Sequence, residues 1–216
     1  EAALIADRTI RLRDGRIDPA ERRVLGEFGR WLADEGVAAG GVGPLEASRI
    51  VDRHLADSLV FARVWGPTPS RVLDVGTGVG LPGIPLAITH PHTTFTLLDR
   101  SGRRCRLARR ATRVLGLSNV SVEHGDVERE ARTWPVVLFR ASLPPVQALA
   151  VGAPLLLDDG CAVVALSRTS RPAAVPPAPP GTTVDVVQTD PGVLDSPAWR
   201  LRMRKTVERS KDGANP

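Results

Sequence analysis

From residue 71 onward, short apolar runs alternate with stretches of helical periodicity, and this order decides the fold class. The runs predicted as strands are 71–75, 94–98, 119–123, 135–139 and 160–166. Helical patterns lie between them, near 82–90, 101–115 and 144–157. Strands that alternate with helices in this way predict an α/β fold with a doubly wound, mostly parallel sheet. Such sheets bind ligands beyond the carboxyl ends of their strands.

The segment before this repeat has helical signals of its own. Asp18 can cap a helix, Pro19 suits the first helical turn, and Glu21 completes the spacing of a capping box. A second helical pattern covers about 50–65. Residues 1–66 are therefore predicted to form an N-terminal helical extension.

Two β-prone stretches, 183–188 and 199–207, follow a proline-rich connector at 169–182. They predict a terminal antiparallel pair that completes the sheet, because proline excludes the connector itself from a central strand. In the second stretch Arg200, Arg202 and Arg204 alternate with other residues, which predicts a half-exposed strand. The expected organisation is a main domain over 67–208, after the helical extension, and a tail over 209–216.

Composition excludes several classes of protein. Hydrophobic residues make up 42% of the 216 positions and charged residues 25%, which is typical of a globular domain with a core. No apolar run approaches the roughly 18 residues of a membrane span, and no signal peptide is recognised. The two cysteines fit a reducing compartment and lack metal-site spacing, so we expect a cytoplasmic protein without a metal. The net charge of +5 favours a polyanionic partner such as nucleic acid.

The most informative stretch is VLDVGTGVGLPGIP, at residues 72–85. Its glycines allow tight turning and a close approach of the backbone to a ligand. The spacing from Gly78 to Gly83 satisfies a dinucleotide fingerprint, with Asp99 at the distance expected for a ribose ligand. S-adenosylmethionine is favoured because Asp74 would balance its cationic amino group but would repel a pyrophosphate. The candidate cofactor residues of this stretch are Asp74, Gly76, Thr77, Gly78 and Gly80.

Two more turns are expected at the same edge of the sheet. Asp99 ends the second strand, where its carboxylate can accept from both ribose hydroxyls or can instead cap the following helix. Asp126 follows the third strand, where it would lie beside an adenine ring or serve as an ordinary turn residue.

The segments DVGTGVGLPGIPLAI, TLLDRSGRR and RHLADS resemble the bacterial small-subunit ribosomal RNA guanine-N7 methyltransferases, also called the glucose-inhibited division protein B family. The resemblance is clear over residues 50–141. It implies a class I (Rossmann-like) methyltransferase fold, S-adenosylmethionine as cofactor, and ribosomal RNA or the small ribosomal subunit as partner. The chain would then methylate guanine N7 in small-subunit ribosomal RNA, and we expect a monomer without a membrane partner.

The resemblance also assigns roles to individual residues. Gly76 and Leu81 match positions that line the S-adenosylmethionine site, and Val127 and Glu128 match the pair beside the adenine. Arg140 matches an arginine at the edge of the active site and is both the candidate catalytic residue and a candidate cofactor residue. On the substrate side the sequence departs from the family; for example, a phenylalanine replaces the serine before this arginine.

These departures keep other functions open: a methyltransferase of the same fold with a small-molecule or different RNA substrate, a non-catalytic binding module, or an NAD-dependent oxidoreductase. Methylation of guanine N7 needs no proton abstraction, because the lone pair is already available. Arg140 is predicted to pair with a phosphate or the target base, or alternatively with a carboxylate such as Asp74. His54 and Asp57 are expected to share a structural hydrogen bond. The arginines of the helix predicted at 101–115 form a candidate track for RNA phosphates, or simply a solvated face.

Overall fold

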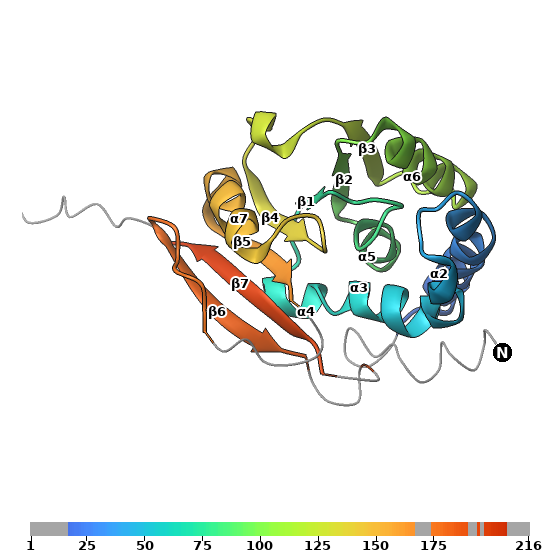
Figure 1. The fold of residues 1–216 in the computed structure, drawn as a ribbon, viewed down its shortest axis with the longest axis horizontal. Helices are drawn as coiled ribbons and strands as arrows, with labels where there is room; N and C mark the ends of the chain where they lie inside the picture. Colours follow the sequence, from blue (N-terminus) through green and yellow to red (C-terminus); the bar gives the residue numbers. More distant parts are fainter. Residues whose placement is uncertain (1–16, 167–173, 190–193, 195–196, 207–216) are drawn as a thin grey trace, which may run out of the picture.

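A seven-stranded sheet with helices on both faces forms the body of the protein (Figure 1). The computed structural model describes residues 17–166, 174–189, 194 and 197–206. The strands are β1 (Arg71–Val75), β2 (Thr94–Asp99), β3 (Val120–His124), β4 (Trp134–Phe139), β5 (Leu156–Ala165), β6 (Thr182–Gln188) and β7 (Trp199–Lys205). Their spatial order is β3-β2-β1-β4-β5-β7-β6, with β7 antiparallel to both of its neighbours and the other pairs parallel. The predicted doubly wound sheet with a terminal antiparallel pair is confirmed.

The helices divide into two layers. They are α2 (Pro19–Trp31), α3 (Asp57–Leu59), α4 (Ala62–Trp65), α5 (Gly83–Thr89), α6 (Gly102–Val114) and α7 (Pro145–Gly152). One apolar cluster joins α2, α5 and α6 to one face of the sheet, and a second joins α7 to the other face. Among the described residues, no helix has the length and apolar character to cross a lipid bilayer.

The first helix of the extension begins at the predicted cap, and the second helical stretch is divided into short segments. Asp18 Oδ1 accepts a hydrogen bond of 2.7 Å from the backbone N–H of Ala20 at the start of α2. The helical stretch expected over about 50–65 is confirmed, but it is divided into a π-helical segment (Ile50–Ala56) and the short helices α3 and α4. The Ser58 hydroxyl donates to the carbonyl of His54, a back-bond that commonly bends a helix.

Two predictions near the C-terminal half need correction. The helix expected over 144–157 ends at Gly152, and β5 begins at Leu156, because Pro154 lacks the N–H that a continuing helix requires. The strand expected to be half exposed carries a buried residue, since Arg200 is only 1% exposed. β7 lies between β5 and β6 rather than at the edge. The predicted tail and part of the proline-rich connector lie outside the described residues.

Candidate cofactor pocket and active site

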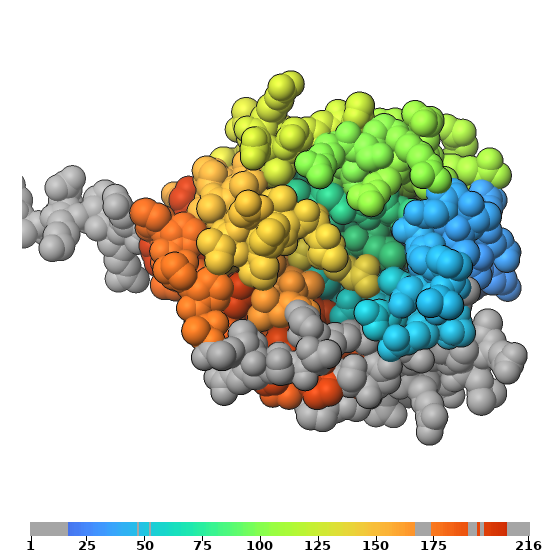
Figure 2. All heavy atoms as spheres, in the orientation of Figure 1, coloured from blue at the N-terminus to red at the C-terminus, as the bar shows by residue number. Residues whose placement is uncertain are grey.

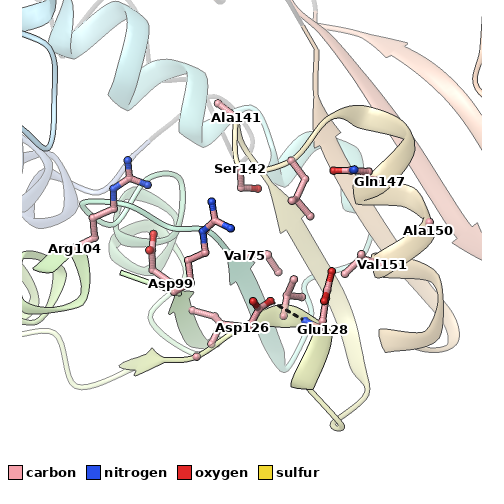
Figure 3. A pocket seen from close by; sticks show the side chains of 16 residues that line it. Val75, Asp99, Arg104, Asp126, Glu128, Ala141, Ser142, Gln147, Ala150 and Val151 are labelled. Carbon is pink, nitrogen blue, oxygen red and sulfur yellow. Dashed lines mark hydrogen bonds between the residues drawn. The ribbon is translucent and has the colours of Figure 1, made fainter. Parts of the chain in front are cut away.

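A cavity of about 310 Å³ opens at the carboxyl ends of β1, β2, β3 and β4. Its lining is made of the turns that follow these strands and of one side of α7 (Figure 3). In the space-filling view, the glycine-rich loop after β1 lies between α6 and the segment that leads into α7 (Figure 2). This is the edge of the sheet at which the sequence predicted a ligand. The volume falls at the lower end of the range of roughly 300–1,000 Å³ that is typical of small-molecule sites.

The loop after β1 turns sharply at its glycines, as predicted. Gly76, Gly78 and Gly80 have φ angles of +67°, +63° and +98°, which favour glycine. A Cβ on Gly76 would lie 2.4 Å from the Cβ of Ser142, in the loop after β4. The absent side chain therefore lets two cavity-lining loops touch.

Asp74 lies beneath this loop and shapes it. Its Oδ2 accepts hydrogen bonds from the Thr77 hydroxyl (2.6 Å) and from the backbone N–H of Gly83 (2.9 Å). Burial raises the pKa of Asp74 to about 6, although these hydrogen bonds and the charge of Arg140 act in the opposite direction. Its Oδ1 is buried and has no hydrogen-bond partner among the described residues. Asp74 is not part of the cavity lining, so its pairing with a cofactor amino group stays a prediction.

Asp99 stands at the end of β2 and lines the cavity. Its Oδ2 accepts from the backbone N–H of Gly78 (2.9 Å), and its Oδ1 accepts from the backbone N–H of Ser101 (2.8 Å). The N-cap of α6 is Ser101, so the alternative of Asp99 as helix cap is wrong. Each carboxylate oxygen still has room for a further donor, because it carries two lone pairs.

The turn after β3 reaches the same cavity. Asp126, Val127 and Glu128 line it, and Asp126 Oδ1 accepts a hydrogen bond of 3.1 Å from the backbone N–H of Glu128 (dashed in Figure 3). Asp126 is thus both a turn residue and a cavity residue, so the two alternatives proposed for it are compatible. Predicted cofactor residues that stand outside the lining are Asp74, Thr77, Gly78, Gly80, Leu81 and Arg140.

The sequence prediction missed most of the α7 side of the cavity and some residues of its other walls. The residues concerned are Arg100, Arg104, Ala141, Ser142, Leu143, Gln147, Ala150 and Val151, together with Val75, Leu98 and Gly125. Ser142 Oγ is buried and lacks a hydrogen-bond partner in the described part of the chain. Because Pro144 and Pro145 mark the start of a helix directly after the fourth strand, they were a signal that α7 begins at this edge.

Arg140 follows β4 and contacts the helical extension. Its Nε donates to Asp57 Oδ2 (3.0 Å), and one terminal nitrogen donates to the carbonyl of Arg53 (3.0 Å) and contacts His54 Nδ1 (3.2 Å). The carboxylate partner suggested from the sequence, Asp74, is wrong, since the ion pair is with Asp57. His54 and Asp57, which we expected to pair directly, both contact this arginine.

Burial and the positive charge of Arg140 lower the pKa of His54 to about 4. The ring is therefore neutral near pH 7. Because a neutral imidazole has one nitrogen acceptor, we assign the N–H to Nε2 and let Nδ1 accept from Arg140.

Three arginines on the arginine-rich face of α6 make hydrogen bonds or ion pairs within the protein. Arg103 donates to the carbonyl of Ala39, Arg109 donates to the carbonyl of Val122, and Arg110 pairs with Glu35. The remaining arginines of this helix, Arg104, Arg106 and Arg113, are exposed. The three arginines that contact the protein are exposed as well. These contacts therefore do not test the predicted track for RNA phosphates, which stays a prediction.

Comparison with known proteins identifies the family. The model of the family described as rRNA small subunit methyltransferase G matches residues 22–171, which include the cavity and its contacts with the extension. The chain belongs to this family. The ribosomal RNA small subunit methyltransferase G of Frankia casuarinae is 33% identical over 83% of this chain and 72% of its own length. Its counterpart from Acidothermus cellulolyticus is 38% identical over 63% of this chain, a match that spans 60% of that relative.

Solved structures agree with the family on the fold. A crystal structure of a putative O-methyltransferase from Klebsiella pneumoniae superposes with a TM-score of 0.55 at 16% identity, covering 89% of this chain and 92% of the other. The strand order and the antiparallel β7 identify a class I methyltransferase fold. No group of three or more His, Cys, Asp or Glu side chains within the described ranges could hold a metal ion.

Proposed function

We propose that this protein transfers the methyl group of S-adenosylmethionine to N7 of a guanine in small-subunit ribosomal RNA. The observation that carries the proposal is the family match over residues 22–171, which includes both the cavity and the extension beside it. We also propose that the enzyme is cytoplasmic and monomeric and that it binds ribosomal RNA.

The cavity suits S-adenosylmethionine on three grounds. Asp99 offers carboxylate oxygens with unused lone pairs, and the turn from Asp126 to Glu128 lines the same cavity beside it. Ser142 Oγ is a buried polar atom without a protein partner, so a bound molecule could supply one. In addition, the lining carries three carboxylates, those of Asp99, Asp126 and Glu128, and two arginines, so a cationic ligand meets more negative than positive side chains there.

When bound, S-adenosylmethionine supplies a methyl group on a positively charged sulfur, which is already activated for transfer. Guanine N7 would accept the methyl group with its own lone pair while the bond from carbon to sulfur breaks and S-adenosylhomocysteine leaves, so the protein needs no general base. The residues of the chain would hold cofactor and base in line and exclude water, which is how alignment lowers a barrier of this kind. Gly76 and Asp99 would serve the cofactor, and Arg140 would serve the RNA.

Calorimetric titration with S-adenosylmethionine tests the cofactor half of the proposal. Asp99→Asn removes one acceptor oxygen while keeping the size of the side chain. We expect it to weaken binding at least about tenfold, or roughly 1.4 kcal/mol. The matched control is Asp185→Asn, because Asp185 pairs with Arg202 far along the sheet, on β6 and β7. The control should bind S-adenosylmethionine with the affinity of the wild type. Absence of binding by the folded wild-type protein would contradict the proposal.

A further inference from the structure

Three distant parts of the chain meet at the carboxylate of Asp57. Its Oδ1 accepts from Arg200 of β7 (2.6 Å), and its Oδ2 accepts from Nε of Arg140 after β4 (3.0 Å). Arg200 also donates to the backbone carbonyl of Asp57 (3.1 Å). Asp57 is 6% exposed and Arg200 1% exposed, so this cluster is shielded from water.

The same cluster fixes the orientation of one guanidinium group. Arg140 is held through Nε by Asp57 and through Nη2 by the Arg53 carbonyl and His54 Nδ1. Its Nη1 makes no hydrogen bond among the described residues, and it is not one of the buried unpartnered atoms. The protein thus binds Nε and Nη2 of the Arg140 guanidinium, while Nη1 stays accessible to a ligand.

The position of this free nitrogen relates it to the reaction. Ala141 and Ser142, the next residues of the chain, line the cavity proposed for the cofactor. Arg140 precedes them directly, and its positive charge acts on Asp74 beneath the glycine-rich loop, so its guanidinium lies near this cavity. An arginine side chain free to rotate would lose considerable conformational entropy on meeting a ligand, and a fixed one would not.

We propose that Asp57 is a positioning residue: anchored by Arg200, it holds Arg140 so that Nη1 is presented to the RNA beside the cofactor cavity. His54 completes the arrangement by accepting from Nη2. This inference rests on the proposed function, because it assigns the free nitrogen to the RNA substrate. The extension is then part of the substrate side of the site, and its contact with Arg140 is how it contributes.

A double-mutant cycle separates this role from a purely structural one. Asp57→Asn keeps the shape but removes the charge that binds Nε of Arg140. We expect it to lower kcat/KM for small-subunit RNA by roughly 10- to 100-fold, as small misplacements of an aligning group do. In an Arg140→Met background, Asp57→Asn should cost little more, because it acts through the missing arginine. The affinity for S-adenosylmethionine should change less than about threefold in every variant. A change of this size is well below a tenfold loss of affinity, which corresponds to about 1.4 kcal/mol.

The control for the cycle is Asp185→Asn, which breaks an arginine–aspartate pair on β6 and β7 and should leave kcat/KM unchanged. Additive losses from Asp57→Asn and Arg140→Met would overturn the positioning role. A wild-type protein that binds S-adenosylmethionine but does not methylate RNA would instead overturn the proposed function, so the two failures are distinguishable.

A second pair of variants covers the case in which Asp57→Asn does not fold. His54→Asn retains an acceptor near the position of Nδ1, whereas His54→Leu removes it. We expect His54→Leu to lower kcat/KM for RNA and His54→Asn to retain most of it, with melting temperatures used to compare their folding. Equal activities for the two variants would contradict the proposal.

Discussion

The contact between Gly76 and Ser142 makes a sharp prediction about the cofactor cavity. Gly76→Ala places a Cβ 2.4 Å from the Cβ of Ser142, so the loop after β4 must move by about 1 Å to restore ordinary contact. That atom is close to the backbone, and a rotamer change of Ser142 cannot relieve the overlap. The substitution should therefore displace the loop itself.

A second glycine separates the two contributions to the stability that Gly76→Ala loses, the backbone conformation and the steric overlap. Gly78 has nearly the same φ as Gly76, +63° against +67°, but a Cβ there would meet nothing within 4 Å. Gly78→Ala should cost about 1–2 kcal/mol from the left-handed conformation alone. Gly76→Ala should cost that amount and a further 1–3 kcal/mol or so for the overlap.

Ser142→Gly should rescue the overlap. It removes the Cβ at 2.4 Å and leaves the Ser142 Cα, which lies at 3.4 Å from the position of the new methyl group. The double variant Gly76→Ala with Ser142→Gly should thus regain most of the difference between the two alanine variants.

The assay is urea unfolding of all four variants, in parallel with titration of S-adenosylmethionine. Gly76→Ala should weaken cofactor binding more than Gly78→Ala, since Gly76 and Ser142 both line the cavity. Equal stabilities for the two alanine variants, or no gain from Ser142→Gly, would refute the argument that the absent side chain sets the spacing of these loops.

The remaining predictions concern charge. Arg200→Met should destabilise the fold by about 1–3 kcal/mol in urea unfolding, because the buried Oδ1 of Asp57 loses this donor while Oδ2 keeps Arg140. Arg202→Met, at the half-exposed pair with Asp185, should cost about 0–1 kcal/mol. The pKa of Asp74 is raised to about 6 from 3.8, so between pH 4 and 6 the folded state binds more protons than the unfolded state does. Stability relative to Asp74→Asn should therefore fall as the pH rises from 4 to 6. The pKa of His54 is lowered to about 4 from 6.5, so stability relative to His54→Asn should fall as the pH drops from 6.5 to 4, again by urea unfolding.

The features that local patterns determine were predicted well. The apolar run at 71–75 is β1 itself, and the run of glycines after it has the positive φ angles that a tight turn requires. The predicted cap at Asp18 is present too, since a helix start depends on a few neighbouring residues. The family resemblance came from the same local motifs and is confirmed.

Long-range contacts were out of reach of such patterns. Asp57 and Arg200 are 143 positions apart, and nothing in the alternation of β7 reveals that the extension supplies a carboxylate to that face. For the same reason the alternative that Arg140 pairs with a carboxylate named Asp74 as an example, whereas the carboxylate in the structure is that of Asp57. The side of the cavity formed by α7 was missed because no motif marks Gln147 or Val151 as lining residues.

The central claim is methyl transfer to guanine N7 of small-subunit ribosomal RNA. The most direct test incubates the protein with that RNA, both naked and as the assembled subunit, and with S-adenosylmethionine carrying a deuterated methyl group. Nucleosides from the digested RNA are then separated by chromatography and identified by mass spectrometry. The account predicts label in 7-methylguanosine, abolished or strongly reduced by Asp99→Asn and retained by Asp185→Asn. Label confined to another nucleoside, or no label in either form of the RNA, would contradict it.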